Sequence, residues 1–306
     1  MPKPIVIGSR GSGLAMRQSE QVAEALRTLL PNTEVTITVI RTTGDKIVDV
    51  PLSRVGEKGL FTKEIEEALL AGDVALAVHS MKDLPTELPK GLCIGAVPKR
   101  EQPYDALISR DGHAVDQLPA HARVGTSSLR RAAQLRAYRK DLEVVPIRGN
   151  VDTRLRKVRE GEVDATVLAA AGLQRMGLAK KITQVLPDTI MLPAPAQGAL
   201  AVEVRDDNAP MREVLARLDD ADSRIAVTAE RTLLAAMGGG CQVPLGALAR
   251  REGGQVVLDA CVCSLDGTQV FWCQAVGDWA RPEEAGFQTA ELLRKQGADA
   301  LLDTLR

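Results

Sequence analysis

The first two thirds of the chain alternate short apolar runs with longer amphipathic stretches. The apolar runs have the length of buried strands, and the amphipathic stretches repeat their apolar residues at helical spacing. In the first part of the chain we expect strands at 4–8, 35–40 and 74–78 and helices at 14–30 and 62–71. This alternation predicts an α/β lobe with a largely parallel sheet.

The same order of elements recurs in the middle of the chain. A strand ends at Gly125 and leads through hydroxyl residues into a helix, just as the first strand leads through Ser9–Gly13 into a helix. The elements expected here are helices at 129–138 and 153–160 and strands at 144–147 and 165–168. We therefore predict a second α/β lobe built like the first.

Proline-containing segments at 98–104 and 193–195 are typical of crossings between lobes. A strand at 199–204 would return to the first sheet after the second crossing. The expected domains are 1–99 with 200–218 as a discontinuous first lobe, 100–199 as the second lobe, and 219–306 as a small α+β domain. The predicted fold class is α/β, with two hinged, doubly wound lobes, a ligand cleft between them and the C-terminal α+β domain.

Composition argues against several classes of protein. The 306 residues carry a formal net charge of -1 and only 2% aromatic residues, which disfavours a nucleic-acid partner. Apolar runs stay below the ~18 residues that span a bilayer, and the first apolar segment is too short for a secretory signal. Five cysteines at irregular spacing form no disulfide framework, and we expect no metal site. The expected location is the reducing cytoplasm.

The loop after Gly125 is the first candidate binding site. Thr126, Ser127 and Ser128 expose backbone N–H groups and hydroxyls at a helix N-terminus, where the helix dipole favours anions. Arg130 and Arg131 add forked guanidinium groups suited to carboxylates. The alternative is a helix N-cap followed by two solvated arginines.

Further arginines follow other expected strands. Arg148 comes directly after a strand, and Gly149 lets backbone approach a ligand. Asp152 or Thr153 would cap the next helix and place Arg154 in its first turn, where a cation opposes the helix dipole. Arg10 and Ser12 repeat the pattern in the first lobe. Arg175 is a weaker candidate, because taken alone it is typical of a surface residue. This convergence of arginines predicts a ligand with several carboxylates.

Lys82 and Asp83 emerge together after the strand at 74–78. Asp83 is a candidate for proton transfer or for stabilising a cationic intermediate. The alternative is an ordinary turn in which Asp83 starts the turn and Lys82 is solvated. His79 alternates into the strand and is interpreted as structural.

Cys241 follows three glycines, Gly238–Gly240, which predicts an exposed sulfur on a mobile loop. Such a thiol is typical of a nucleophile or of a covalent attachment point. The alternative is a hinge loop with an incidental cysteine. The glycine-containing segment 46–61, which includes Lys58 and Phe61, is expected either to close over the cleft or to be a plain surface loop.

Taken together, these segments resemble the hydroxymethylbilane synthase (porphobilinogen deaminase) family. The matching stretches, in family order, are VHSMKDLP (78–85), VGTSSLRR (124–131), IRGNVDTRL (147–155), LAAAGLQR (168–175), PAQGALAVE (195–203) and GGGCQVPLGA (238–247). The resemblance implies two lobes similar to type II periplasmic binding proteins and a third domain. It also implies a cytoplasmic transferase of tetrapyrrole and heme biosynthesis that acts as a monomer, without nucleic acid or membrane.

The resemblance also implies the chemistry. Four porphobilinogen units would be joined head to tail, each losing ammonia, onto a dipyrromethane cofactor attached through Cys241. Hydrolysis would then release linear hydroxymethylbilane and leave the cofactor in place. Asp83, assisted by Lys82, would be the catalytic carboxylate that stabilises positive charge on the pyrroles.

The family's other site residues carry over by position. The implied cofactor-binding residues are Cys241, Lys82, Asp83, Thr126, Ser127, Ser128, Arg130, Arg131, Gly149 and Arg154. The implied substrate-binding residues are Arg10, Ser12, Arg148, Arg154, Arg175, Gln197 and Gly198. Lys58 and Phe61 would belong to the active-site loop, and no metal ligand is implied.

Two other readings stay open from the residues alone. A two-lobed binding protein for a polyanion explains the arginines and the hinge, but it leaves Cys241 in its glycine loop unexplained. An enzyme that uses Cys241 as a transient nucleophile in group transfer would lack a permanently bound chromophore.

Overall fold

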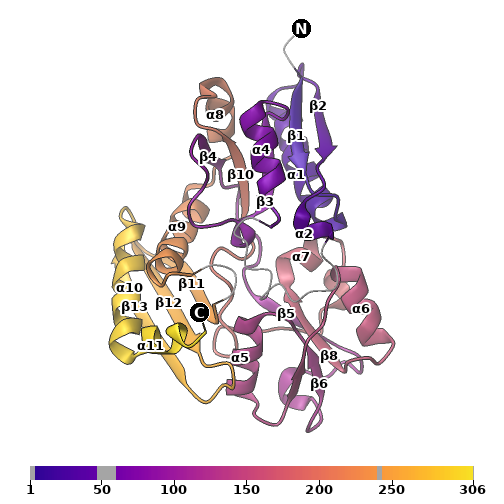
Figure 1. The fold of residues 1–306 in the computed structure, drawn as a ribbon, viewed down its shortest axis with the longest axis vertical. Coiled ribbons are helices and arrows are strands. Elements are labelled where there is room, and N and C mark those ends of the chain that lie inside the picture. Colours follow the sequence, from indigo (N-terminus) through magenta and orange to yellow (C-terminus); the bar gives the residue numbers. More distant parts are fainter. Residues whose placement is uncertain (1–3, 47–59, 240–242, 306) are drawn as a thin grey trace. The chain divides into compact units, whose positions relative to one another are not determined.

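A computed structural model describes residues 4–46, 60–239 and 243–305 (Figure 1). The chain divides into two compact units. The first unit comprises Met1–Arg100 and Ala199–Arg224, and the second comprises Glu101–Gly198 and Ile225–Arg306.

The first unit is built on a five-stranded sheet of order β2-β1-β3-β10-β4. β1 pairs in parallel with β2 and β3, whereas β10 runs antiparallel to both β3 and β4. The strands are β1 (Ile5–Ser9), β2 (Val35–Val39), β3 (Leu76–Ser80), β4 (Leu92–Ala96) and β10 (Leu200–Arg205). β10 follows the second crossing in sequence and lies between β3 and β4 in this sheet.

Helices cover both faces of this sheet because its strands are apolar on both sides. On one face, Ile7 and Leu76 pack in a core with Leu26 of α1 (Gly13–Leu29) and with α8 (Ala209–Ala216). On the other face, Ala77 packs against Ile65 of α4 (Lys63–Ala71). The short helix α2 (Thr43–Lys46) and the 3-10 turn η1 (Met81–Asp83) complete the described part of this unit.

The second unit repeats this topology, with a five-stranded sheet of order β7-β6-β8-β5-β9. β6 pairs in parallel with β7 and β8, and β5 runs antiparallel to β8 and β9. The strands are β5 (Asp105–Ser109), β6 (Arg123–Gly125), β7 (Glu143–Val145), β8 (Ala165–Ala169) and β9 (Gln184–Val185). The strand that runs antiparallel to its neighbours is β10 in the first sheet and β5 in the second, and each follows a proline-containing crossing. This shared arrangement confirms the predicted repetition of the α/β lobe.

The helices of this part of the second unit also lie on two faces. Leu135 of α5 (Leu129–Tyr138) packs with Leu107 and Val167 on one face. α6 (Val151–Arg159) and α7 (Ala170–Arg175) pack with Ala106 and Ile108 on the other. Two 3-10 turns, η2 (Val115–Gln117) and η3 (Ala179–Lys181), lie in the connections.

The C-terminal region forms an antiparallel three-stranded sheet of order β11-β12-β13. Its elements are α9 (Ala221–Ala236), β11 (Leu245–Glu252), β12 (Gln255–Cys263), β13 (Val270–Asp278), α10 (Pro282–Gln296) and α11 (Ala298–Asp303). Figure 1 shows α10 and α11, in yellow, beside this sheet. Within the second unit, Cys261 and Cys263 of β12 pack against Ala133 of α5. This small α+β region and the two α/β sheets confirm the predicted fold class.

Several predicted elements differ from the observed ones. β4, β5, β9 and β11 were absent from the sequence-based expectation, and β7 lies at 143–145 rather than at 144–147. α6 begins at Val151 because Asn150 caps it, so the expected cap at Asp152 or Thr153 is wrong. No helix in the described part of the chain is long and apolar enough to cross a membrane.

Candidate active site

In the first unit, site residues follow two neighbouring parallel strands. Ser12 caps α1 just after β1, and its hydroxyl accepts a hydrogen bond from the backbone N–H of Ala15 at 3.3 Å. The guanidinium carbon of Arg10 lies 4.2 Å from the centre of the Phe61 ring. This is a cation–π contact. The structure therefore brings together two residues that the sequence assigned to different parts of the site.

Lys82 and Asp83 lie on η1, the turn that follows β3. Their neighbours Met81 and Leu84 are buried in the unit and fix the turn from both ends. The backbone N–H of Met81 donates to the carbonyl of Ala199 at 3.0 Å. Asp83 itself is exposed and Lys82 is half-buried, so an anchored turn presents the Asp83 carboxylate to solvent.

Helix α1 ties the ends of β1 and β3 to each other. The amide nitrogen of Gln18 donates to the Ser80 hydroxyl at 2.8 Å, and the Ser19 hydroxyl donates to that of Ser9 at 2.7 Å. Gln18, Ser19 and Ser9 are all buried. These bonds fix the strand ends from which Arg10 and the Asp83 turn emerge.

His79 is buried, as its position in the strand predicted. Its Nε2 lies 3.1 Å from Oε2 of Glu203, which is fully buried on β10. Glu66 of α4 belongs to the same group, and burial raises the pKa of its carboxyl group, with a smaller contribution from Glu203. The hydroxyl of Thr62 and, more weakly, His79 act in the opposite direction on that pKa.

In the second unit, the hydroxyl loop after β6 is held by its own hydrogen bonds. Ser128 caps α5 and accepts from the backbone N–H of Arg131 at 3.4 Å. Thr126 Oγ1 accepts from the backbone N–H of Ser128 at 3.2 Å. Ser127 Oγ donates to the carbonyl of Ile147 at 2.8 Å, which joins this loop to the end of β7. The loop is therefore a fixed N-terminal cap.

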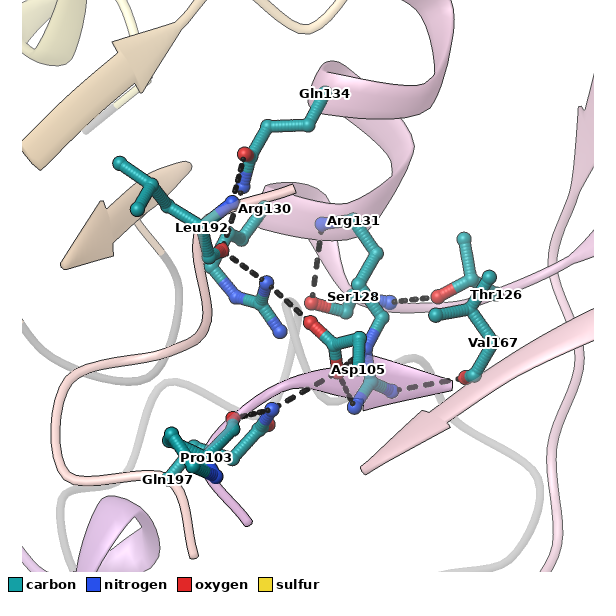
Figure 2. Close-up of polar contacts among 10 residues, drawn as sticks. All are labelled: Pro103, Asp105, Thr126, Ser128, Arg130, Arg131, Gln134, Val167, Leu192 and Gln197. Atoms are coloured by element: carbon teal, nitrogen blue, oxygen red, sulfur yellow. Dashed lines mark hydrogen bonds and ion pairs between the residues drawn. The ribbon is translucent and has the colours of Figure 1, made fainter. Parts of the chain in front are cut away.

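Arg130 and Arg131 are only 4% and 6% exposed, so neither is the solvated arginine of the alternative interpretation. Figure 2 shows the Asp105 carboxylate bonded to both of them. Nη1 of Arg130 lies 2.7 Å from Oδ2 of Asp105, and Nη2 of Arg131 lies 2.8 Å from Oδ1. Arg130 also donates to the carbonyl of Leu192 at 2.7 Å.

Arg154 experiences positive charge from its neighbours. Its Nε donates to the carbonyl of Gly149 at 2.9 Å, and Gly149 adopts a positive φ of 110°. Burial, together with the nearby cations Arg131 and Arg148, lowers the pKa of Arg154 from its ordinary value to about 10. A carboxylate placed here would relieve this repulsion, so the residues fit a polycarboxylate ligand.

Gln197 and Gly198 follow the second crossing, and Arg175 at the end of α7 reaches the same place through its side chain. Nη2 of Arg175 donates to the carbonyl of Gly198 at 2.8 Å, and burial lowers the pKa of Arg175 although Glu101 acts in the opposite direction. Gln197 is fully buried, and its Nε2 donates to Oδ1 of Asp105 at 3.0 Å. A Cβ on Gly198 would lie 2.5 Å from the carbonyl oxygen of Glu101, so glycine is required there.

Within each sheet, the arrangement of strands explains which candidates meet. β7, β6 and β8 are neighbouring parallel strands, so the residues after their carboxyl ends gather at one edge of the second sheet. That edge carries Arg130, Arg131, Arg148, Arg154 and the segment leading to Arg175. The corresponding edge of the first sheet carries Arg10, Ser12, Lys82 and Asp83.

Lys58 and Cys241 lie outside the described residues. On the N-terminal side of Cys241, Gly238 lies just past the end of α9, with a φ of 64° and its N–H donating to the carbonyl of Ala235. A Cβ on Gly239 would lie 2.5 Å from the side chain of Leu234. These two glycines therefore have structural reasons to be glycine.

Sequence reasoning missed Asp105, Gln18 and the cap Asn150. Asp105 directly follows the crossing at 98–104, and an acid at the head of the apolar run DALIS is a signal that could have found it. Gln18 has no local signal, because its partner Ser80 is 62 positions away. Asn150 directly precedes the helix and follows the ordinary preference for N-caps, so it was detectable.

Comparison with known proteins gives two family matches. Residues 5–213 match the model "Porphobilinogen deaminase, dipyromethane cofactor binding domain", and residues 224–295 match "Porphobilinogen deaminase, C-terminal domain". The chain is 53% identical over 306 residues to the porphobilinogen deaminase of Desulforudis audaxviator, covering 100% of this chain and 99% of that protein. It is 50% identical over 301 residues to that of Syntrophobacter fumaroxidans, covering 98% and 97%.

Two solved structures align more distantly. The aliphatic sulphonate binding protein SsuA of Escherichia coli aligns with a TM-score of 0.43 and 13% identity, covering 97% of this chain and 88% of SsuA. The probable amino-acid binding protein ytmK of Bacillus subtilis aligns with a TM-score of 0.43 and 11% identity, covering 71% and 90%. The family matches, by contrast, extend over nearly the whole chain. The chain therefore belongs to the porphobilinogen deaminase (hydroxymethylbilane synthase) family, transferases of tetrapyrrole biosynthesis that use a dipyrromethane cofactor.

Proposed function

We propose that this chain condenses four porphobilinogen units head to tail, with loss of ammonia, and releases linear hydroxymethylbilane by hydrolysis. The observation that carries the proposal is the positive charge around Arg154, whose pKa is lowered to about 10 by burial and by two neighbouring arginines. Each porphobilinogen carries an acetate and a propionate group. Every added unit therefore brings carboxylates that Arg131, Arg148 and Arg154 are suited to hold.

Asp83 is proposed as the catalytic carboxylate, with Lys82 beside it. Loss of ammonia leaves a cationic pyrrole, and an exposed carboxylate on an anchored turn stabilises such a cation without having to reorganise. Buried Met81 and Leu84 supply that anchoring. Arg10 and Ser12 on the first unit, and Arg148, Arg154, Arg175, Gln197 and Gly198 on the second, are proposed to bind substrate.

The cofactor is proposed to be attached through Cys241 and held by the hydroxyl loop at Thr126–Ser128, by Arg130, Arg131 and Arg154, and at Gly149. When bound, the dipyrromethane supplies the pyrrole carbon to which the first porphobilinogen is joined. Lys58 and Phe61 are proposed to belong to a loop over the site, and the contact of Phe61 with Arg10 supports this for Phe61.

The remaining proposals concern the domains, the oligomeric state and the cellular location. We propose three domains, with 1–99 and 200–218 as the first, 100–199 as the second and 219–306 as the third. The enzyme is proposed to work as a cytoplasmic monomer without nucleic acid or membrane.

Replacing Asp83 tests the proposal. We expect Asp83→Asn to lower kcat for porphobilinogen roughly 10²- to 10⁴-fold, the range for loss of a catalytic acid–base group. Because Asp83 is exposed, the melting temperature should change little. Asp73→Asn, an exposed aspartate in the same unit, is the matched control and should leave both values unchanged. A wild-type protein that binds porphobilinogen without releasing ammonia would contradict the proposal and favour a binding protein.

A further inference from the structure

Asp105 is a buried carboxylate for which the proposed reaction has no direct use. It is the first residue of β5, and its side chain is fully buried. Side chains two positions apart on a strand share a face, so Asp105 lies on the face of Leu107, which packs against α5. This explains why a strand residue meets the arginines in the first turn of that helix.

The contacts of Asp105 divide its two oxygens between two arginines (Figure 2). Oδ2 accepts from Nη1 of Arg130 at 2.7 Å, and Oδ1 accepts from Nε of Arg131 at 3.0 Å. Nη1 of Arg131 is directed to the carbonyl of Val167 at 3.1 Å. The planes of both guanidinium groups are thus set by fixed acceptors on β5 and β8 and, for Arg130, at Leu192.

Further residues hold this arrangement in place. Nε2 of Gln197 bonds to Oδ1 of Asp105 at 3.0 Å and to the carbonyl of Pro103 at 2.8 Å. Gln134 exchanges two hydrogen bonds with the backbone of Leu192, the residue whose carbonyl accepts from Arg130. Residues that flank both crossings, Pro103 and Gln197, therefore meet at the Asp105 carboxylate.

The electrostatic reason for a carboxylate here is clear. Arg130 and Arg131 are adjacent, nearly fully buried, and lie at the end of α5 where the helix dipole disfavours cations. Arg148 and Arg154 add positive charge nearby. One buried carboxylate offsets part of this charge and still leaves the site positive for a ligand.

We infer that Asp105 is a positioning residue, which orients Arg130 and Arg131 so that they hold the carboxylates of the pyrrole cofactor in the reactive geometry. This inference rests on the proposed function. Asparagine at this position offers one acceptor oxygen, and its NH₂ group would face an arginine donor. One guanidinium then loses its acceptor and must turn, while the shape of the residue is kept.

The test compares three variants as purified from cells. Asp105→Asn removes the charge, and Thr166→Val removes a buried hydrogen bond to the Gly125 carbonyl in the same sheet, 2.8 Å long, without touching the arginines. Asp111→Asn removes an exposed aspartate that pairs with Arg110 in the same unit. Intact mass gives the fraction of each protein that carries dipyrromethane, thermal unfolding gives stability, and initial rates give kcat and KM per loaded molecule.

We expect Asp105→Asn to have less than a third of the wild-type loaded fraction and at least a tenfold lower kcat per loaded molecule, with KM for porphobilinogen within threefold. Thr166→Val should melt at a lower temperature but load fully and turn over normally. Asp111→Asn should match the wild type.

Wild-type loading and kcat in Asp105→Asn would overturn the inference. An equal loss of loading and kcat in Thr166→Val would overturn it too, because Asp105 would then matter only for stability. A failure of the proposed function is distinguishable from these outcomes. In that case the wild-type protein itself carries no pyrrole mass and consumes no porphobilinogen.

Discussion

Arg154 offers a sharp test because function and stability should respond in opposite directions to its loss. Its side chain is partly buried, its Nε donates to the Gly149 carbonyl, and its nearby charged groups are Arg131 and Arg148. The substitution Arg154→Gln removes a cation that destabilises the folded state, because it is partly buried beside two other arginines. The same change removes a donor of charge-assisted hydrogen bonds to a carboxylate.

The structure gives the size of each effect. A pKa lowered from the ordinary arginine value to about 10 corresponds, at about 1.4 kcal/mol per pH unit, to roughly 3 kcal/mol of unfavourable interaction. Solvent screening at a partly exposed side chain reduces this to about 1–2 kcal/mol, or a rise of roughly 2–5 °C in melting temperature. A lost charge-assisted bond of about 1.5–3 kcal/mol raises KM roughly 10- to 100-fold.

Thermal unfolding and initial rates with porphobilinogen measure the two effects. Arg156→Gln is the matched control, because Arg156 is exposed on the same helix and pairs with Glu160. We expect that control to leave KM within twofold and not to raise the melting temperature. An unchanged KM in Arg154→Gln, or a melting temperature lowered by several degrees, would refute the reasoning that this arginine is kept for a ligand.

Three other changes test other parts of the structure. Burial raises the pKa of Glu66, so the folded state holds that proton to higher pH than the unfolded state does, and stability is lost as pH rises from the unfolded-state pKa through the folded-state pKa. Thermal unfolding of Glu66→Gln should therefore show a stabilisation over wild type that is larger at neutral pH than at acid pH. Phe61→Ala removes the ring under Arg10 and should raise KM about 2- to 5-fold in initial-rate assays, from a contact of about 0.5–1 kcal/mol. Gly198→Ala should destabilise the protein to urea by about 1–3 kcal/mol because φ is +90° and the new Cβ would meet a backbone carbonyl. Gly177→Ala, with φ of +70° and open space around it, should cost less.

Local patterns predicted much of the fold. Helix α5 has the predicted bounds because Ser128 caps it and its apolar residues recur at helical spacing. α4 ends at Gly72 in the left-handed conformation, as expected for a glycine at that position. Strand β5 was missed because its first residue is an aspartate directly after a proline-containing segment, and its pairing with β8 is a non-local contact.

The candidate site was predicted in kind but not in its contacts. The repeated order of strand, polar loop and helix indicated which arginines gather at the carboxyl edge of the second sheet. It gave no information on their partners, because Asp105 reaches Arg130 from another strand, 25 positions away in sequence. Gln197 remains a proposed substrate contact, and its amide also bonds to Asp105 and to the carbonyl of Pro103, an arrangement that residue type alone does not specify.

The central claim is that the chain carries a covalent dipyrromethane on Cys241, and intact mass followed by peptide mapping tests it most directly. The wild-type protein, purified without added ligand, should show an excess mass equal to two linked pyrroles on the peptide that contains Cys241. Cys241→Ser, purified in parallel, should show the mass of the unmodified chain. An unmodified wild-type mass that stays unchanged after incubation with porphobilinogen would contradict the account.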